Sequence, residues 1–186
     1  MNALLLDASK STLLLIDMQE RLLPAMDGSA EVEQRCGILL KAAKALDIPV
    51  TASEQYPKGL GPIVPGLKAE IGNAPVFAKL AFSGWRDAAL KAHFIDHHEQ
   101  GRPLVIIAGI EAHVCVLQTA VDLAAAGFGV FAVADATASR APSSAALALD
   151  RMRQGGVSVV NTEMVVFELL GKAGTAEFRE LSALIR

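Results

Sequence analysis

Short runs of Val, Ile and Leu recur along this chain and alternate with longer stretches whose apolar residues follow a helical period. The runs predict six strands, at residues 12–17, 48–52, 75–79, 103–109, 128–134 and 157–160. The helical stretches lie at residues 31–46, 84–98, 114–126, 142–154, 162–171 and 175–185. Polar and apolar residues barely alternate within the runs, as expected for strands that helices cover on both sides. The pattern therefore predicts a three-layer α/β fold with a doubly wound, mostly parallel six-stranded sheet of the Rossmann-like type.

The composition predicts one domain that spans residues 1–186. With 52% hydrophobic residues, the chain can bury a substantial core. The formal net charge is -3 and the 17 Lys and Arg residues are scattered, so we expect no nucleic-acid partner. No apolar run reaches the roughly 20 residues of a membrane helix, and no basic leader precedes the first leucines. We therefore expect a cytoplasmic protein with no membrane partner.

One long connection, residues 53–74, interrupts the alternation. It holds four glycines and three prolines, which predicts an ordered surface loop. Loops that leave the carboxyl ends of parallel strands line the crevice where α/β proteins bind ligands. We therefore expect five side chains to converge at one edge of the sheet, namely Asp17, Gln55, Tyr56, Lys79 and Cys115.

The two cysteines lie in different contexts. Cys115 follows the apolar run 104–108 at the point where strand gives way to helix. The first N–H groups of a helix favour a thiolate and can receive an oxyanion, although a buried, inert thiol is the alternative. Cys36 lies inside a predicted helix, and we assign it no chemistry.

Three segments carry a resemblance to a known family. They are Leu13-Leu14-Leu15-Ile16-Asp17-Met18-Gln19, the strand-Lys block Pro75-Val76-Phe77-Ala78-Lys79, and the turn Gly109-Ile110-Glu111-Ala112-His113-Val114-Cys115. In this order and spacing, the chain resembles the isochorismatase-like cysteine hydrolases, the superfamily that also contains nicotinamidases. The resemblance covers nearly the whole chain. It implies that Asp17 is a general acid and base, that Lys79 is its partner, and that Cys115 is a nucleophile that forms a thioester.

The resemblance also implies how the acyl intermediate is surrounded. It places a cis peptide bond between Ile110 and Glu111, and the backbone amides of Glu111 and Cys115 are the candidate oxyanion donors. Phe82 and Trp85 could belong equally well to the core or to a substrate pocket. The candidate substrate pocket comprises Gln55, Tyr56, Phe82, Trp85 and His113.

The chain departs from the nicotinamidases at their metal site. Those enzymes bind a divalent metal through an Asp-x-His element and another His after the second strand, where this chain reads Thr51-Ala52-Ser53-Glu54-Gln55-Tyr56-Pro57. Zinc and iron sites draw on imidazole or thiolate, so we expect no nicotinamidase-type metal and no cofactor. We interpret the later imidazoles as a solvated helix end; these are His93, His97 and His98.

These observations lead to one leading hypothesis and two alternatives. The leading hypothesis is a metal-independent cysteine hydrolase of a small amide, carbamate or ureide. The alternatives are hydrolysis of an isochorismate-like vinyl ether and a non-catalytic or thiol redox-sensing protein on the same scaffold. The Ala-rich stretch 141–149 and the resemblance both favour a homo-oligomer, a dimer or larger.

Overall fold

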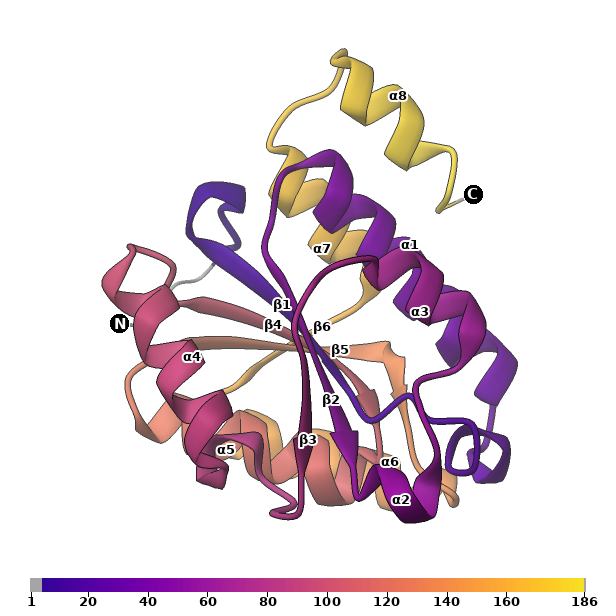
Figure 1. Cartoon of the computed structure of the whole chain (residues 1–186). Helices are drawn as coiled ribbons and strands as arrows, with labels where there is room; N and C mark the ends of the chain where they lie inside the picture. The colour runs from indigo at the N-terminus through magenta and orange to yellow at the C-terminus, as the bar shows by residue number, and fades with distance from the viewer. Residues whose placement is uncertain (1–4, 186) are drawn as a thin grey trace.

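The computed structural model describes residues 5–185, and a twisted parallel sheet lies at its centre (Figure 1). The strands are β1 (Ser11–Ile16), β2 (Val50–Gln55), β3 (Val76–Lys79), β4 (Leu104–Ile110), β5 (Gly129–Ala138) and β6 (Ser158–Val160). They are arranged in the order β3-β2-β1-β4-β5-β6, and every neighbouring pair is parallel. The predicted three-layer, doubly wound α/β fold is confirmed.

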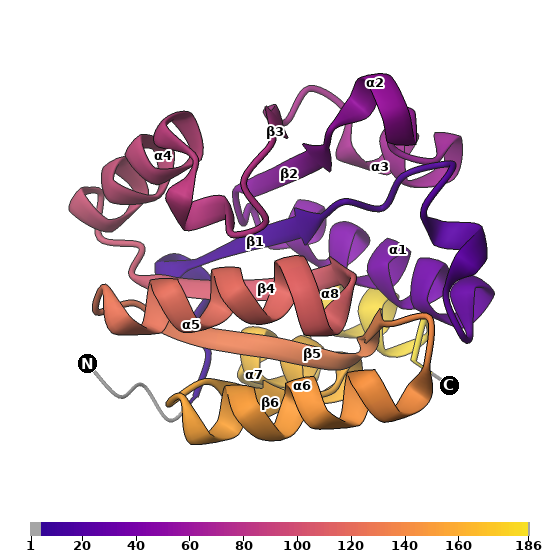
Figure 2. The ribbon, with the colours of Figure 1, turned by 90° about the horizontal axis from the view of Figure 1, so that it is seen from below.

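Helices cover both faces of the sheet (Figures 1 and 2). The α-helices are α1 (Ser29–Ala45), α2 (Pro57–Leu60), α3 (Pro65–Ile71), α4 (Ala88–Glu99), α5 (Leu117–Ala125), α6 (Pro142–Gln154), α7 (Thr162–Leu170) and α8 (Ala176–Ser182). A π-helical turn, η4 (Ala112–Val116), leads into α5, and shorter 3-10 turns are η1 (Ala8–Lys10), η2 (Leu23–Ala25) and η3 (Gly84–Arg86).

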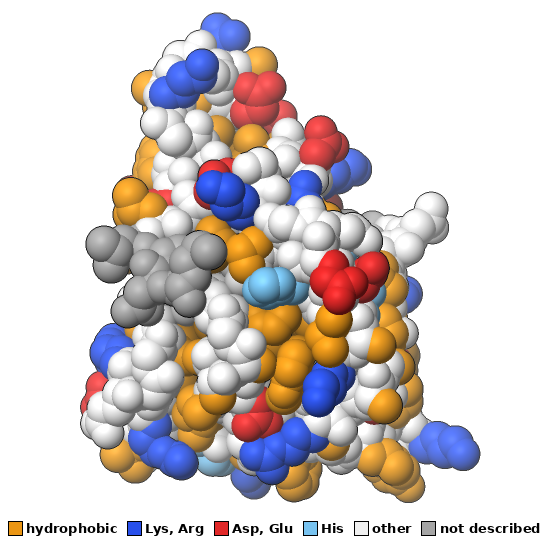
Figure 3. All heavy atoms as spheres, turned by 90° about the vertical axis from the view of Figure 1, so that its left-hand side faces the viewer, with side chains coloured by type: hydrophobic (Ala, Val, Ile, Leu, Met, Phe, Trp, Pro, Cys, Tyr) orange, Lys and Arg blue, Asp and Glu red, His pale blue; other side chains and the backbone are white. Residues whose placement is uncertain are grey.

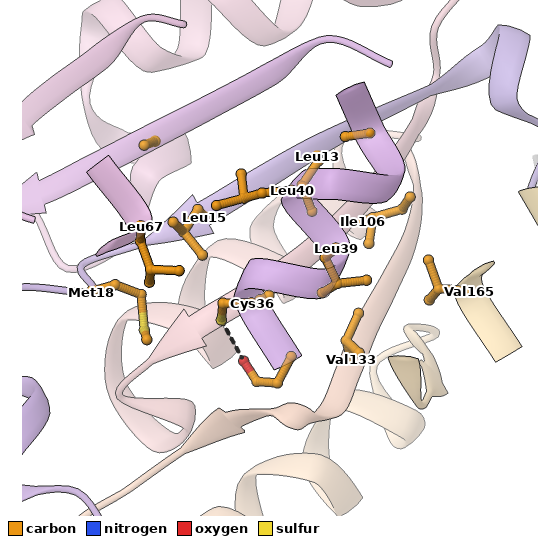
Figure 4. Close-up of a cluster of buried hydrophobic side chains, with 14 of the residues drawn as sticks. Leu13, Leu15, Met18, Cys36, Leu39, Leu40, Leu67, Ile106, Val133 and Val165 are labelled. Atoms are coloured by element: carbon orange, nitrogen blue, oxygen red, sulfur yellow. Dashed lines mark hydrogen bonds between the residues drawn. The ribbon is translucent and has the colours of Figure 1, made fainter. Parts of the chain in front are cut away.

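Strand β1 shows how the chain builds two cores. Leu13 and Leu15 point to the face covered by α1, α3 and α7, whereas Leu14 and Ile16 point to the face covered by α4, α5 and α6. This separation follows from the two-residue period of side chains along a strand. Figure 4 shows the first of these cores, in which Cys36 of α1 is enclosed by leucine and valine side chains.

The prediction of a loop over residues 53–74 was wrong. The segment contains the end of β2 and two helices, and Leu67 and Ile71 of α3 are buried. Both helices begin at a proline, Pro57 and Pro65, and proline is favourable at the first helical position because its missing N–H has no partner there. From the sequence alone, without the packing of α3, the same prolines indicate a loop.

Gly109 lets the two central strands approach closely at their carboxyl ends. Its φ of +117° is unfavourable for other residues, and a Cβ placed on it would lie 2.1 Å from the carbonyl oxygen of Ile16. Ile16 is also its partner in the register of β1 and β4. Asp17, which follows Ile16, therefore leaves the sheet beside the last residues of β4.

The surface carries no stripe of one charge on the face shown in Figure 3, where Lys and Arg side chains are interspersed with acidic and apolar ones. Within residues 5–185, no helix is long and apolar enough to cross a membrane.

Candidate active site

Asp17 lies directly after β1 and is completely buried. Its φ of +53° is in the left-handed region, which Asp tolerates better than most residues. Its backbone N–H donates to the Ser53 carbonyl at 3.0 Å, and its Oδ1 accepts a hydrogen bond from Ser53 Oγ at 2.6 Å. Strand β2 therefore fixes both the backbone and the carboxylate of Asp17.

Lys79 ends the edge strand β3, and its side chain is as inaccessible as that of Asp17. The ammonium donates to Asp17 Oδ2 at 2.7 Å, to Gln55 Oε1 at 2.7 Å and to the Phe82 carbonyl at 3.3 Å. These three acceptors match the three protons of an ammonium group. A buried charge is tolerated only when it is paired and hydrogen-bonded, and Lys79 meets both conditions.

Gln55 links the ion pair to the thiol. Its Oε1, which accepts from Lys79, also lies 4.0 Å from Cys115 Sγ, and its Nε2 donates to the Leu80 carbonyl at 2.9 Å. Gln19 fixes the backbone of Gln55 from both sides, since its Oε1 accepts from the Gln55 N–H at 2.8 Å and its Nε2 donates to the Gln55 carbonyl at 3.0 Å. The position of Gln55 is thus determined by hydrogen bonds at both ends of the residue.

Cys115 lies in the turn η4 and keeps 5% of its surface exposed. Burial, followed by the nearby Asp17 carboxylate, raises the pKa of the Cys115 thiol to about 12, and the Lys79 ammonium acts in the opposite direction. In the resting protein, burial and Asp17 therefore favour the protonated form of the Cys115 thiol. At neutral pH the sulfur carries its proton, and only a proton acceptor close by can remove it.

The turn before Cys115 is held on both sides. The peptide bond between Ile110 and Glu111 is cis, and the Glu111 carboxylate pairs with Arg140 Nε at 2.8 Å. Thr119 Oγ1 donates to the Cys115 carbonyl at 2.6 Å. It also accepts from the Gly84 N–H at 2.9 Å, so the segment after β3 is connected to the helix that follows Cys115.

The predicted pocket residues separate into four groups. Gln55 belongs to the buried centre, whereas Tyr56 and Phe82 are 52% and 53% exposed and lie on the segments that follow β2 and β3. His113 shares η4 with Cys115, and its Nδ1 lies 2.8 Å from Ser139 Oγ. Trp85 lies elsewhere, because it packs edge-on against Phe128. Phe128 directly precedes β5 and so lies at the amino-terminal ends of the strands.

A surface pocket of about 290 Å³ lies beside the ion pair. Its lining residues are Tyr56, Pro57, Lys58, Ala78, Lys79 and Leu80. Leu80 is 75% exposed. The pocket therefore offers apolar surface next to Lys79, which contacts Asp17.

The interpretation of three helical imidazoles as a solvated helix end was wrong for His93 and His97. Both are half-buried, and His93 lies beside Thr51 of β2 and against the Phe77 ring of β3. Only His98 is exposed. Among the described residues, no group of three or more His, Cys, Asp or Glu side chains is arranged to hold a metal ion.

Sequence reasoning did not identify Ser53 and Gln19 as site residues. Ser53 precedes Gln55 by two positions on the same strand, so the two-residue period could have placed both side chains on one face. Gln19 gives no such signal, because its role depends on how the chain turns after β1. It meets Gln55 only because Gln19 and Ile63 form an isolated antiparallel bridge.

Comparison with known proteins relates the whole chain to one family. Residues 11–164 match the Isochorismatase domain model. Isochorismatase domain-containing protein 2 of Danio rerio is 40% identical over 181 residues, which cover 97% of this chain and 89% of that protein.

Two solved structures are also closely similar. The MAR1 ribonuclease of Caenorhabditis elegans superposes with a TM-score of 0.89 at 35% identity, covering 97% of this chain and 91% of that one. The YcaC gene product of Escherichia coli, an octameric hydrolase of unknown specificity, has a TM-score of 0.88 at 27% identity and covers 99% of this chain and 92% of that one.

Proposed function

The chain belongs to the isochorismatase-domain family of hydrolases, and from this premise we propose that it hydrolyses a small amide, carbamate or ureide through a thioester on Cys115. One observation carries the proposal. The fully buried pair of Lys79 and Asp17, 2.7 Å apart, shares Gln55 with the only thiol that the structure leaves partly accessible among the described residues.

The first step moves the thiol proton to Asp17. The Cys115 thiol is protonated in the resting protein, so attack on a carbonyl carbon needs a base within reach. As the sulfur forms its bond to the acyl carbon, Asp17 accepts the proton and the carbonyl electrons move onto oxygen. The Lys79 ammonium, 2.7 Å from Asp17 Oδ2, holds the carboxylate in place.

The second half of the reaction returns the enzyme to its starting state. The oxyanion is held by backbone amides of Cys115 and Glu111, and one such donor is typically worth about 3 kcal/mol in the barrier. Collapse of the tetrahedral intermediate breaks the carbon to nitrogen bond, and Asp17 gives its proton to the departing amine. The same carboxylate then removes a proton from water, which attacks the thioester. The carbon–sulfur bond breaks, the acid is released, and Asp17 returns the proton to the Cys115 sulfur.

Gln55 and Ser53 are positioning residues in this scheme. Gln55 Oε1 accepts from Lys79 and faces the thiol, so it keeps the ammonium between the carboxylate and the sulfur. Ser53 donates to the other oxygen of Asp17, which directs the remaining lone pairs of that carboxylate. The metal-free character of the proposed chemistry follows from this set of groups, since proton transfer needs only Asp17, Lys79 and Cys115.

The tyrosine and phenylalanine at the rim suit a small substrate with an apolar part. Tyr56 and Phe82 are exposed on the two segments that border the ion pair, and we propose both as substrate contacts together with His113. Trp85 is not part of the proposed pocket, because its ring packs against Phe128. In line with the octameric relative, we further propose that the protein is a homo-oligomer.

The ribonuclease name of the Caenorhabditis elegans relative supplies a competing substrate class. A net charge of -3 and a thiol that is 95% buried do not suit a polyanionic chain. The expectation of no nucleic-acid partner therefore stands as part of the proposal.

The test is a substrate panel of small amides, carbamates, ureides, a vinyl ether and single-stranded RNA, assayed with the wild-type protein and with Cys115→Ala. Cys36→Ala is the matched control, because it removes the other thiol. We expect release of ammonia or amine that disappears in Cys115→Ala and persists in Cys36→Ala. Turnover that survives in Cys115→Ala, or cleavage of only the vinyl ether or RNA, would refute the proposal. Oxidation of Cys115 to a sulfenic acid by low peroxide, without any turnover on the panel, would favour the redox-sensing alternative.

A further inference from the structure

A second group of polar side chains lies away from the candidate active site, between α4 and the sheet. His93 and His97 are four residues apart on α4 and therefore share one face of the helix. Their Nε2 atoms lie 3.1 Å apart, and Thr51 Oγ1 of β2 lies 2.8 Å from His93 Nε2. The His97 nitrogen and the Thr51 hydroxyl oxygen thus both lie next to His93 Nε2.

Hydrogen bonding among these groups leaves one atom without a partner. A neutral imidazole carries one proton on two nitrogens, so a hydrogen bond between the two facing Nε2 atoms needs an N–H on one and a lone pair on the other. Whichever tautomer His97 adopts, its Nδ1 is buried and has no hydrogen-bond partner. The cluster is therefore not a fully satisfied structural network.

The geometry matches a recognised mode of metal binding. Two histidines at positions i and i+4 of a helix present their nitrogens to the same ion, as in helical zinc motifs. Zinc binds an imidazole nitrogen at about 2.0–2.1 Å, so nitrogens 3.1 Å apart can both reach one ion. Imidazole also suits nickel and copper, and a hydroxyl or water can complete the shell.

We propose that His93 and His97 bind one divalent transition-metal ion, with Thr51 and water as the remaining ligands. No third imidazole, thiolate or carboxylate within the described residues completes the group, so the site exchanges its ion with solvent. Thr51 precedes Gln55 by four residues on β2, which corresponds to about 13 Å along a strand. The site is therefore separate from Asp17, Lys79 and Cys115, and it does not rest on the proposed hydrolase activity.

A bound ion would connect α4 to β2, the strand that carries Ser53 and Gln55. Any ligand that binds only the folded state raises the free energy of unfolding. Metal binding at this position is therefore expected to raise the melting temperature whether or not the protein turns over a substrate.

Zinc alone is the probe for this site. The chelator-treated full chain is titrated with Zn²⁺ by calorimetry, and its thermal unfolding is followed with and without the ion. We expect one equivalent to bind and to raise the melting temperature, with affinity that weakens at acidic pH as the imidazoles become protonated. In His97→Ala the affinity falls at least about tenfold and the thermal shift disappears.

Three further variants identify the ligands. His98→Ala is the matched control, because this third imidazole of α4 packs against Phe128 and should leave zinc binding unchanged. His97→Gln keeps the size of the side chain, so a loss of binding there cannot be attributed to a cavity. Cys115→Ala should retain the equivalent of zinc. The proposal is overturned if wild-type protein shows no zinc-dependent thermal shift, if His97→Gln binds as tightly as wild type, or if Cys115→Ala loses the ion.

Discussion

Cys36 and Cys115 are both buried thiols, and burial is the largest cause of the raised pKa of each. Their neighbours differ completely. Cys36 has no exposed surface, and its thiol donates to the Ala136 carbonyl at 3.5 Å within an apolar cluster (Figure 4). Cys115 keeps a small exposed area and lies beside Gln55, Lys79 and Asp17.

This difference shows that depth alone does not make a thiol inert or reactive. In the core cluster around Cys36, the thiol donates to a backbone carbonyl and has no exposed surface, so the proton stays. At the carboxyl edge of the sheet, a carboxylate and an ammonium surround a thiol of similar acidity. We attribute the reactivity of Cys115 to the charged pair of Asp17 and Lys79.

The largest effect is expected when each of the two cysteines is replaced by alanine in turn. Cys115→Ala should lower kcat by at least about 10³-fold, because it removes the attacking atom. Cys36→Ala should keep its kcat and lose only about 1–2 kcal/mol of stability from the small cavity it leaves. Steady-state assays and urea denaturation of both variants measure the contrast. Equal losses of kcat in the two variants would remove the distinction between them.

Asp17→Asn separates the two ways in which the carboxylate acts on the sulfur. Hydrolysis should be lost, because the amide cannot accept the thiol proton. Alkylation of Cys115 by iodoacetamide at neutral pH should become faster, because the Asp17 carboxylate raises the pKa of the thiol and the variant lacks it. The buried Lys79 is left without its counter-ion, so stability should fall by about 3 kcal/mol.

Lys79→Met provides the opposite control for this experiment. The ammonium lowers the pKa of Cys115, so its removal should slow alkylation at the same pH. Peptide mapping by mass spectrometry gives the rate at each cysteine, and near-ultraviolet circular dichroism shows that the variants stay folded. Alkylation that is slower in Asp17→Asn than in wild type would contradict the proposed coupling.

The fold was largely predictable from the sequence, whereas the connections within the site were not. Val, Ile and Leu runs indicated the central strands β1 and β4 most clearly, because strands buried on both faces have few polar residues. Asp17, Lys79 and Cys115 could be expected at one edge, since each follows a parallel strand. That Gln55 joins Lys79 to Cys115 depends on the register in which Gln55 pairs with Lys79, and no local pattern specifies this register.

The errors in the sequence analysis share a physical cause. Helix α3 and the contacts of His93 depend on packing against elements that are distant along the chain. From the sequence, Trp85 could belong to the pocket or to the core, and its ring lies against Phe128. Tertiary contacts decide such positions, and local propensity does not.

Gln55→Leu should have a smaller effect than loss of either charge. The variant removes an acceptor of Lys79 and leaves the ammonium with two partners in place of three. We expect kcat to fall by about tenfold to a hundredfold, with a loss of about 1–3 kcal/mol from the unsatisfied buried donor. Gln55→Glu is the control that restores an acceptor, but its added charge should slow alkylation of Cys115. A Gln55→Leu variant with wild-type kcat would exclude Gln55 as a positioning residue.

The smallest effect concerns stability at alkaline pH. An ordinary thiol has a pKa of 9.0, and the folded protein holds both cysteines protonated well above that value. Above pH 9 the unfolded chain therefore loses thiol protons that the folded chain retains, so the free energy of unfolding falls as pH rises. Urea denaturation at a series of pH values should show a shallower alkaline decline for Cys36→Ala than for wild type. Identical declines would indicate that Cys36 ionises normally in the folded protein.

The most direct test of the central claim is to trap the acyl intermediate on a substrate identified from the panel. The reaction is quenched with acid during turnover, and the peptides are mapped by mass spectrometry. We predict that the acyl mass lies on the peptide that contains Cys115, that hydroxylamine removes it, and that the peptide containing Cys36 is unmodified. Turnover with no adduct on Cys115, or with an adduct on Cys36, would contradict the account.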